Sequence, residues 1–156
     1  MSLKQPKTIL IVDDHAMFAE TLGQYLRSMF VNDEVKVVTS AERARQEASM
    51  RPIDVVLLDL EMSDCTGLTL LADFATLPRP PASIIVSMHM GPLWIERALK
   101  AGARGYVAKD SSPKEIVMAI EQALQGKKYL SRSVAQAFAE NAVRAPANGK
   151  EIHRAL

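Results

Sequence analysis

The sequence of 156 residues has a single cysteine, Cys65, and no long hydrophobic run. One cysteine excludes an internal disulfide bond and a zinc site built from several cysteines. No apolar segment approaches the ~18 residues that a membrane-spanning helix needs. The N-terminus has no secretory signal, because its short apolar start leads directly into acidic residues. We therefore expect a cytoplasmic protein that has no membrane partner.

An excess of charge of one sign is also missing, since the formal net charge is +1. This value alone neither favours nor excludes nucleic acid as a partner. The charge is uneven along the chain: residues 127–156 hold six Lys or Arg against two Glu, a surplus of four, which leaves −3 for residues 1–126. We interpret the basic end as a solvated helix and linker. The 48% of hydrophobic and 24% of charged residues are typical of one soluble domain with a core.

Two apolar runs lead directly into acidic residues. Val55–Leu58 precedes Asp59, and Ile9–Val12 precedes the pair Asp13 and Asp14. A continuous apolar run of this length predicts a strand buried on both faces, as in a parallel sheet. The acidic residues would then lie at the carboxyl ends of the strands, where open α/β sheets place their ligands.

The pattern of a strand followed by a helix occurs five times. The predicted strands cover residues 8–12, 35–38, 55–58, 84–86 and 105–108. An amphipathic helix follows each strand, and the signals that start these helices are Asp14, Ser40, Pro92 and Ser112. This alternation predicts a parallel sheet with helices on both faces, joined by right-handed crossovers. A further amphipathic helix is predicted over residues 133–143, and a linker over residues 145–156.

Four of the methionines fall within the predicted helices or at their ends. Methionine fills irregular gaps in hydrophobic cores. We therefore predict that these side chains are buried: Met17, Met29, Met50 and Met118.

Polar residues with complementary chemistry follow the predicted strands. They are Asp13 and Asp14, Asp59, Ser87 and Lys109. Three carboxylates at one edge would repel one another unless a cation lay among them, and hard oxygen ligands suit Mg²⁺. Such an ion would screen Asp59 from an approaching phosphoryl group and permit it to act as a nucleophile. Lys109 and the Ser87 hydroxyl would hold the remaining phosphoryl oxygens.

This set of residues resembles the receiver domain of two-component response regulators, and the resemblance covers residues 7–126. It implies a flavodoxin-like (βα)5 fold with strand order 2-1-3-4-5, here followed by an extra C-terminal helix. It also implies that Asp59 is phosphorylated by a partner histidine kinase, which makes the chain a phosphoacceptor rather than an enzyme for an external substrate.

The resemblance also implies roles for the other site residues. Asp13 or Asp14, Asp59 and the backbone carbonyl of Glu61 would hold Mg²⁺. Ser87 would be the switch hydroxyl, Lys109 the cation that binds the phosphoryl group, and Tyr106 the aromatic residue that reorients on activation.

Several short sequence segments are similar to those of the NarL/FixJ subfamily, including the predicted closing helix around Tyr129-Leu130-Ser131. The other segments are Val12-Asp13-Asp14-His15, Ser87-Met88-His89, Ala101-Gly102-Ala103-Arg104-Gly105-Tyr106 and Lys109-Asp110-Ser111-Ser112-Pro113. Members usually continue into a LuxR-type helix-turn-helix domain that binds DNA. We therefore expect residues 127–156 to be a C-terminal helix and linker. Either the chain stops before a DNA-binding domain that regulates transcription, which we favour, or it is a stand-alone receiver. We also expect a homodimer on activation, formed through the tail helix and the surface of the fourth helix, the fifth strand and the fifth helix.

Three other functions are weighed against this one. A haloacid-dehalogenase-like phosphatase also has a strand-end Asp nucleophile and Mg²⁺, but it needs a second Asp where this chain has Glu61. A flavodoxin-like nucleotide-binding protein needs a Gly-, Ser- or Thr-rich loop after the first strand, where this chain has Asp13 and Asp14. A degenerate receiver that serves only as an interaction module would lack one of the acids or Lys109, and all are present.

Some single residues allow two interpretations. We interpret His15 as a polar residue at a helix start rather than as part of the pocket, and Asp64 as a charge near the site without a ligand role. His89 is either an exposed loop residue or a determinant of the dephosphorylation rate. Trp94 belongs either to the core or to a contact surface, and the isomer of the Lys109–Asp110 peptide bond is open.

Overall fold

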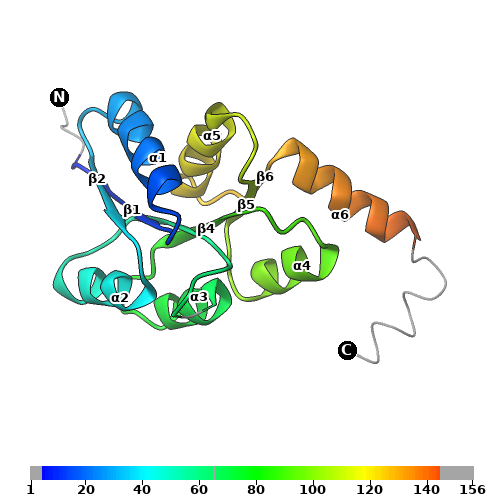
Figure 1. Cartoon of the computed structure of the whole chain (residues 1–156), viewed down its shortest axis with the longest axis horizontal. Coiled ribbons are helices and arrows are strands. Elements are labelled where there is room, and N and C mark those ends of the chain that lie inside the picture. The colour runs from blue at the N-terminus through cyan, green and yellow to red at the C-terminus, as the bar shows by residue number, and fades with distance from the viewer. Residues whose placement is uncertain (1–4, 65, 145–156) are drawn as a thin grey trace.

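The computed structural model describes residues 5–64 and 66–144. Six strands form one parallel sheet in the order β2-β1-β3-β4-β5-β6 (Figure 1). The strands are β1 (Thr8–Val12), β2 (Glu34–Val38), β3 (Val55–Leu58), β4 (Ala82–Ser87), β5 (Gly105–Ala108) and β6 (Tyr129–Leu130). The flavodoxin-like α/β fold and the order of the first five strands are thus confirmed.

The helices cover both faces of the sheet. Helices α1 and α5 lie on one face, and α2, α3 and α4 lie on the other, while α6 extends from the sheet beside α4 (Figure 1). The helices are α1 (Ala16–Met29), α2 (Ala41–Met50), α3 (Gly67–Ala75), α4 (Pro92–Lys100), α5 (Pro113–Leu124) and α6 (Arg132–Arg144). No helix among the described residues is long and apolar enough to cross a bilayer. The predicted linker over residues 145–156 lies outside the described residues.

Strand β3 shows why its sequence is apolar throughout. Val55 and Leu57 pack into the core under α1 and α5, whereas Val56 and Leu58 pack into the core on the opposite face. All four side chains are at most 1% exposed. A strand in the middle of a doubly covered sheet alternates its side chains between two cores, and so needs hydrophobic residues at every position.

Strand β6 is a difference from the sequence prediction. Tyr129 and Leu130 were expected in a helix, but they pair in parallel with Gly105 and Tyr106 of β5. Helix α6 begins only at Arg132. A strand of two residues is too short to produce a hydrophobic period, so the pattern of apolar residues did not reveal it.

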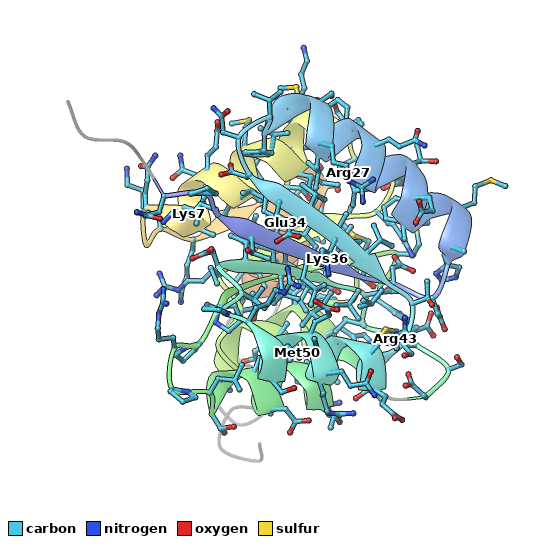
Figure 2. All side chains as sticks on the ribbon, turned by 90° about the vertical axis from the view of Figure 1, so that its left-hand side faces the viewer. Lys7, Arg27, Glu34, Lys36, Arg43 and Met50 are labelled. Atoms are coloured by element: carbon cyan, nitrogen blue, oxygen red, sulfur yellow. The ribbon has the colours of Figure 1, made fainter. Side chains whose placement is uncertain are left out.

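The prediction that four methionines are buried is wrong. Their exposed fractions are 84% for Met17, 51% for Met29, 71% for Met50 and 48% for Met118. Met29 and Met50 are the last residues of their helices, beyond the last buried residues of α1 and α2, which are Leu26 and Ala44. Figure 2 shows Met50 on α2, together with the charged residues Glu34 and Lys36 of the edge strand β2.

The predicted helix starts are confirmed with one exception. The Ser40 hydroxyl accepts a hydrogen bond from the Arg43 N–H at the start of α2, and Ser112 does the same for Lys114 at the start of α5. Asp14 does not cap α1, because the N-cap position is His15 and its side chain makes no capping hydrogen bond. The Asp14 carboxylate instead accepts a hydrogen bond from the backbone of Ser63 at 2.8 Å.

Candidate functional site

The predicted site residues follow neighbouring strands at one edge of the sheet. Asp13 and Asp59 come next after Val12 and Leu58, which are paired in register, and the Asp59 N–H donates to the Val12 carbonyl at 3.1 Å. Further along the sheet, the Lys109 N–H donates to the carbonyl of Ser87 at 2.9 Å. The parallel ladder therefore sets the backbone positions of the site, and the loops after the strands position the side chains.

The ammonium group of Lys109 joins the two buried acids. Its Nζ lies 2.7 Å from Asp13 Oδ2 and 3.4 Å from Asp59 Oδ2, and its side chain is only 8% exposed. It also lies 4.7 Å from the centre of the Phe18 ring on α1, a cation–π distance. The predicted site thus contains one ion-paired cluster of Asp13, Asp59 and Lys109. These three residues follow strands that are far apart in the chain.

The carboxylate of Asp59 is held in an environment that disfavours its charge. Burial raises the pKa of Asp59, the negative charge of Asp13 raises it further, and Lys109 opposes both effects. The Glu61 N–H also donates to Asp59 Oδ1 at 3.4 Å. A partner that brings positive charge to this position would therefore stabilise the ionised, nucleophilic form.

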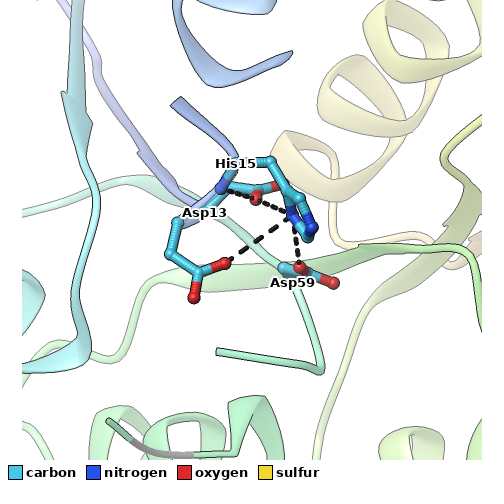
Figure 3. A group of neighbouring side chains, drawn as sticks. Asp13, His15 and Asp59 are labelled. Carbon is cyan, nitrogen blue, oxygen red and sulfur yellow. Dashed lines mark hydrogen bonds and ion pairs between the residues drawn. The ribbon is translucent and has the colours of Figure 1, made fainter. Parts of the chain in front are cut away.

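His15 belongs to this cluster as well as to the start of α1. Its Nδ1 atom lies 2.9 Å from Asp13 Oδ1, 3.5 Å from Asp59 Oδ2 and 3.6 Å from Asp14 Oδ1 (Figure 3). The interpretation of His15 as no more than a polar residue at a helix start is wrong. The direction of its ring depends on the path of the loop after β1, which a strand pattern does not specify.

The acidic group can hold a cation. Asp13, Asp14, His15 and Asp59 each place one ligand atom so that all four lie within 4.8 Å of one another. Carboxylate oxygens from three residues are the donors that a hard divalent cation prefers. The donor set therefore fits a divalent metal, as the sequence predicted.

Ser87 and Tyr106 are connected through one backbone residue. The Ser87 side chain is fully buried, and its Oγ accepts a hydrogen bond from the His89 N–H at 3.0 Å. Tyr106 is also fully buried and donates its hydroxyl to the carbonyl of His89. Burial raises the pKa of Tyr106 to about 12, so this hydroxyl remains a donor at neutral pH. The two predicted switch residues are thus hydrogen-bonded to the same residue, Ser87 to the N–H of His89 and Tyr106 to its carbonyl.

The loops around the site contain two contacts that the sequence analysis missed. The exposed carboxylate of Glu61 pairs with His89 Nε2 at 3.0 Å, and the His89 ring lies 5.3 Å from that of Trp94. Trp94 is half-buried and packs against the core, while remaining open to this loop.

Asp64 also has a structural role that was not foreseen. Its carboxylate accepts hydrogen bonds from the N–H groups of Ala41 at 3.1 Å and Glu42 at 3.3 Å, at the start of α2. These hydrogen bonds, that of Ala41 first, lower the pKa of Asp64. No local pattern reveals the contact, because Asp64 and Ala41 are 23 residues apart. The Lys109–Asp110 peptide bond is trans.

Comparisons with known proteins agree with this geometry. The profile of the response regulator receiver domain matches residues 9–121. The transcriptional regulatory protein UhpA of Salmonella typhimurium is 32% identical over 131 residues, which cover 82% of this chain and 64% of UhpA. The nitrate/nitrite response regulator protein NarL of Escherichia coli is 30% identical over 139 residues, which cover 89% of this chain and 64% of NarL. The chain thus spans less than two thirds of the length of these curated relatives.

Solved structures give the same result. The crystal structure of a LuxR-family two-component response regulator from Aurantimonas sp. superposes with a TM-score of 0.82 at 29% sequence identity, covering 89% of this chain and 99% of that one. A CheY-like receiver domain protein from Methanospirillum hungatei superposes with a TM-score of 0.71 at 25% identity, covering 78% and 96%. Together with the acidic cluster at the strand ends, these matches show that the chain belongs to the response regulator receiver domain family, in its NarL/LuxR subfamily.

Proposed function

We propose that Asp59 accepts a phosphoryl group from a sensor histidine kinase, and that this reaction controls the output of a LuxR-family response regulator. The observation that carries the proposal is the position of Asp59. It is 3% exposed, follows a central strand, and lies beside both Lys109 and a second buried acid, Asp13. In a receiver domain, an acid in this setting is the candidate nucleophile.

The transfer needs one bond to form and one to break. A carboxylate oxygen of Asp59 attacks the phosphorus of the kinase phosphohistidine, so that a P–O bond forms and the P–N bond breaks. The electron pair of the P–N bond returns to the imidazole of the kinase. Lys109, 3.4 Å from Asp59 Oδ2, would bind one phosphoryl oxygen, and the Ser87 hydroxyl would donate to another.

We further propose that the cation of the acidic cluster is Mg²⁺. Receiver domains bind a divalent metal through an acidic pocket of this kind. Asp13, Asp14, Asp59 and the Glu61 carbonyl would hold it. When bound, Mg²⁺ neutralises charge on the phosphoryl oxygens and on the acids that surround them. Lys109 would then exchange its contact with Asp13 for one with the phosphoryl group.

The output would begin with Ser87. Its Oγ accepts the His89 N–H and has its own proton free to donate, so a rotation of the hydroxyl toward a phosphoryl oxygen would displace His89 with it or break this hydrogen bond. The His89 carbonyl is the acceptor of the Tyr106 hydroxyl, so a shift of His89 would release Tyr106. Ser87, His89 and Tyr106 would thus have an inactive and an active arrangement in equilibrium. Phosphorylation would shift this equilibrium only by the difference in free energy with which the phosphoryl group binds the two arrangements.

The partners of the output belong to the same proposal. The relatives that the chain matches are longer, and UhpA is a transcriptional regulatory protein. We propose that a DNA-binding domain joined after the receiver (residues 7–126) and the C-terminal helix and linker (residues 127–156) acts on transcription, with dimerisation on activation. Sedimentation of the chain with and without beryllofluoride tests the dimerisation, and an unchanged monomer would contradict it.

Intact-mass analysis tests the phosphoacceptor. With acetyl phosphate and Mg²⁺, we expect one phosphoryl group on the wild type and on Asp73→Asn, whose carboxylate pairs with Arg45 on the surface. We expect none on Asp59→Asn and none on the wild type in EDTA. Equal incorporation by wild type and Asp59→Asn would overturn the proposal.

A further inference from the structure

The Nδ1 atom of His15 lies between two neighbours that require opposite hydrogen-bonding roles of it. Its Nδ1 lies 2.9 Å from Asp13 Oδ1 and also 2.9 Å from the Lys109 ammonium. An ammonium can only donate and a carboxylate can only accept. If Nδ1 carries a lone pair, it suits Lys109 but faces an Asp13 oxygen that is also an acceptor. If Nδ1 carries a proton, it suits Asp13 but opposes the ammonium.

A metal ion that displaces the Lys109 ammonium from Nδ1 resolves this conflict, because it accepts electron pairs from both the nitrogen and the oxygen. In an octahedral site with metal–ligand distances of ~2.1 Å, neighbouring ligand atoms lie ~3 Å apart. The distances from Nδ1 to the oxygens of Asp13, Asp59 and Asp14 are 2.9, 3.5 and 3.6 Å, close to that separation. The ring is already turned toward the oxygens that would be its fellow ligands (Figure 3).

The contacts of Asp13 fix the ring at this position. Asp13 is 2% exposed, and its Oδ1 atom also accepts the backbone N–H of His15 at 2.8 Å. The His15 backbone and ring are thus bound to the same carboxylate oxygen. The side chain of His15 is 60% exposed, so a hydrated ion can reach the ring from solvent.

We propose that His15 is a nitrogen ligand of the divalent metal in the acidic pocket. An imidazole suits transition metals, whereas Mg²⁺ favours oxygen. His15 therefore shifts the selectivity of this receiver toward Mn²⁺, Co²⁺, Ni²⁺ and Zn²⁺, compared with the same pocket without the ring. This inference rests on the proposed function, in that it assigns a metal to the pocket, but it does not require phosphoryl transfer.

The experiment compares Ni²⁺ and Mg²⁺ binding by titration calorimetry on untagged chain in three forms: wild type, His15→Asn and His89→Asn. We expect His15→Asn to lose about tenfold or more in Ni²⁺ affinity, with Mg²⁺ affinity changed less than threefold. The matched control His89→Asn removes the histidine that pairs with Glu61 outside the cluster, and should leave the ratio of the two affinities unchanged. An equal loss for both metals in His15→Asn, or no loss, would overturn the inference.

Pulsed EPR of the Mn²⁺-bound chain gives a second readout that does not depend on affinity. We expect coupling to an imidazole nitrogen in the wild type and in His89→Asn, and its disappearance in His15→Asn. If wild type shows no nitrogen coupling, His15 is not a ligand. If the wild type binds neither Mg²⁺ nor Ni²⁺ at the pocket, both the inference and the metal in the proposed function are overturned. Normal metal binding without phosphorylation of Asp59 would overturn the proposed function alone and leave this inference intact.

Discussion

Burial of the Asp59 carboxylate favours its reactivity and lowers the stability of the folded chain. Its ordinary pKa is 3.8, and in the folded chain burial, then the charge of Asp13, raise its pKa. The folded chain therefore binds this proton more tightly than the unfolded chain does. As a result, the free energy of unfolding falls as the pH rises from 3.8 through the folded pKa, and it stays lower at neutral pH.

An uncharged side chain at position 59 removes this loss of stability. In EDTA at pH 7, we expect Asp59→Asn to be more stable than the wild type by on the order of 1 kcal/mol. The gain should disappear as the pH falls below 3.8, where both states of the wild type carry the proton. Urea denaturation over this pH range measures it. A wild type that is more stable than Asp59→Asn at pH 7 would contradict the conclusion that folding raises the pKa of Asp59.

Lys109 has the opposite effect on stability. Its side chain is 8% exposed and supplies the positive charge for Asp13 and Asp59. We predict that Lys109→Met destabilises the metal-free chain by about 3 kcal/mol at pH 7, since two buried carboxylates lose their partner. Added Mg²⁺ should restore much of this loss.

A surface lysine provides the control for this experiment. Lys100 is 72% exposed and pairs with Glu96 one turn earlier on α4. Lys100→Met should change the free energy of unfolding by less than about 0.5 kcal/mol. If Lys109→Met and Lys100→Met lose the same free energy of unfolding, the buried ion pairs contribute no more to stability than a surface ion pair.

The sequence predicts the charged residues of the site better than their contacts. Asp13, Asp59 and Lys109 follow strands, and strands in a parallel sheet end at a common edge, so their proximity follows from the pattern alone. The partners of His15 and Asp64 depend on loop paths and side-chain rotamers, which have no periodic signal. The sequence therefore predicts the ion-paired acids, but not the ring that lies among them.

At the scale of elements, the start of α3 limits the position of Asp59. Gly67 is the first residue of α3 and donates its N–H to the Leu60 carbonyl at 2.9 Å. A Cβ atom at this position would lie 2.3 Å from the Asp59 carbonyl oxygen and 2.9 Å from Leu60 Cα. Because both are backbone atoms of the site loop, the loop would have to move.

We therefore predict that Gly67→Ala destabilises the chain by about 3 kcal/mol and slows phosphorylation of Asp59. Gly91 provides the matched control, since it precedes α4 and a Cβ there would meet only Trp94 Cδ1, at 3.5 Å. Gly91→Ala should stay within about 0.5 kcal/mol of wild type in thermal and urea unfolding. A Gly67→Ala protein with normal stability and phosphorylation would show that the loop adapts.

The elements themselves were predicted unevenly, for a physical reason. Helices such as α5 have several turns of apolar period and clear start signals, so Pro113–Leu124 could be predicted closely. Strand β6 has two residues and is specified by its neighbours. The Ser131 N–H donates to the Tyr106 carbonyl, and the Ser131 hydroxyl accepts from the Ala108 N–H, both at 3.0 Å. These are tertiary contacts, and no local pattern contains them.

At the scale of the whole molecule, β6 and the first part of α6 pack on the rest of the receiver domain. Val134 of α6 is fully buried in the core beside α4, and Ser131 is fully buried next to β5. The hydroxyl of Tyr129 and the N–H of Arg132 both donate to the carboxylate of Glu115 on α5. These contacts connect the C-terminal helix to the strand that carries Tyr106.

We predict that the fragment 1–128 is less stable than the full chain by about 3 kcal/mol. The expected loss comes from one buried valine and from buried backbone hydrogen bonds that β5 no longer makes. Chemical denaturation of the two proteins measures the difference. Equal stability would mean that the residues after 128 contribute nothing to the stability of the receiver, which would favour the predicted domain boundary at residue 126.

The family membership also decides between the functions that were weighed for the whole chain. It excludes a haloacid-dehalogenase-like phosphatase and a nucleotide-binding protein, because the match to the receiver profile extends over residues 9–121. The fold class could be predicted because strands and helices alternate in a regular order, and the subfamily because short segments such as Lys109-Asp110-Ser111-Ser112-Pro113 resemble those of its members. The partners could not, since the kinase and the target are recognised by surfaces whose specificity no single sequence reveals.

The all-parallel order of the sheet has a consequence for how the chain folds. Neighbouring parallel strands cannot form as a hairpin, because each connection has to cross over through a helix. Strand β1 has β2 and β3 as its neighbours, so it has no partner until the chain has continued through α1 and beyond. During synthesis, Thr8–Val12 therefore emerges as an apolar segment without a sheet to join. We expect the formation of β1 ladders to limit the folding rate, since closing such long loops precedes any gain from pairing.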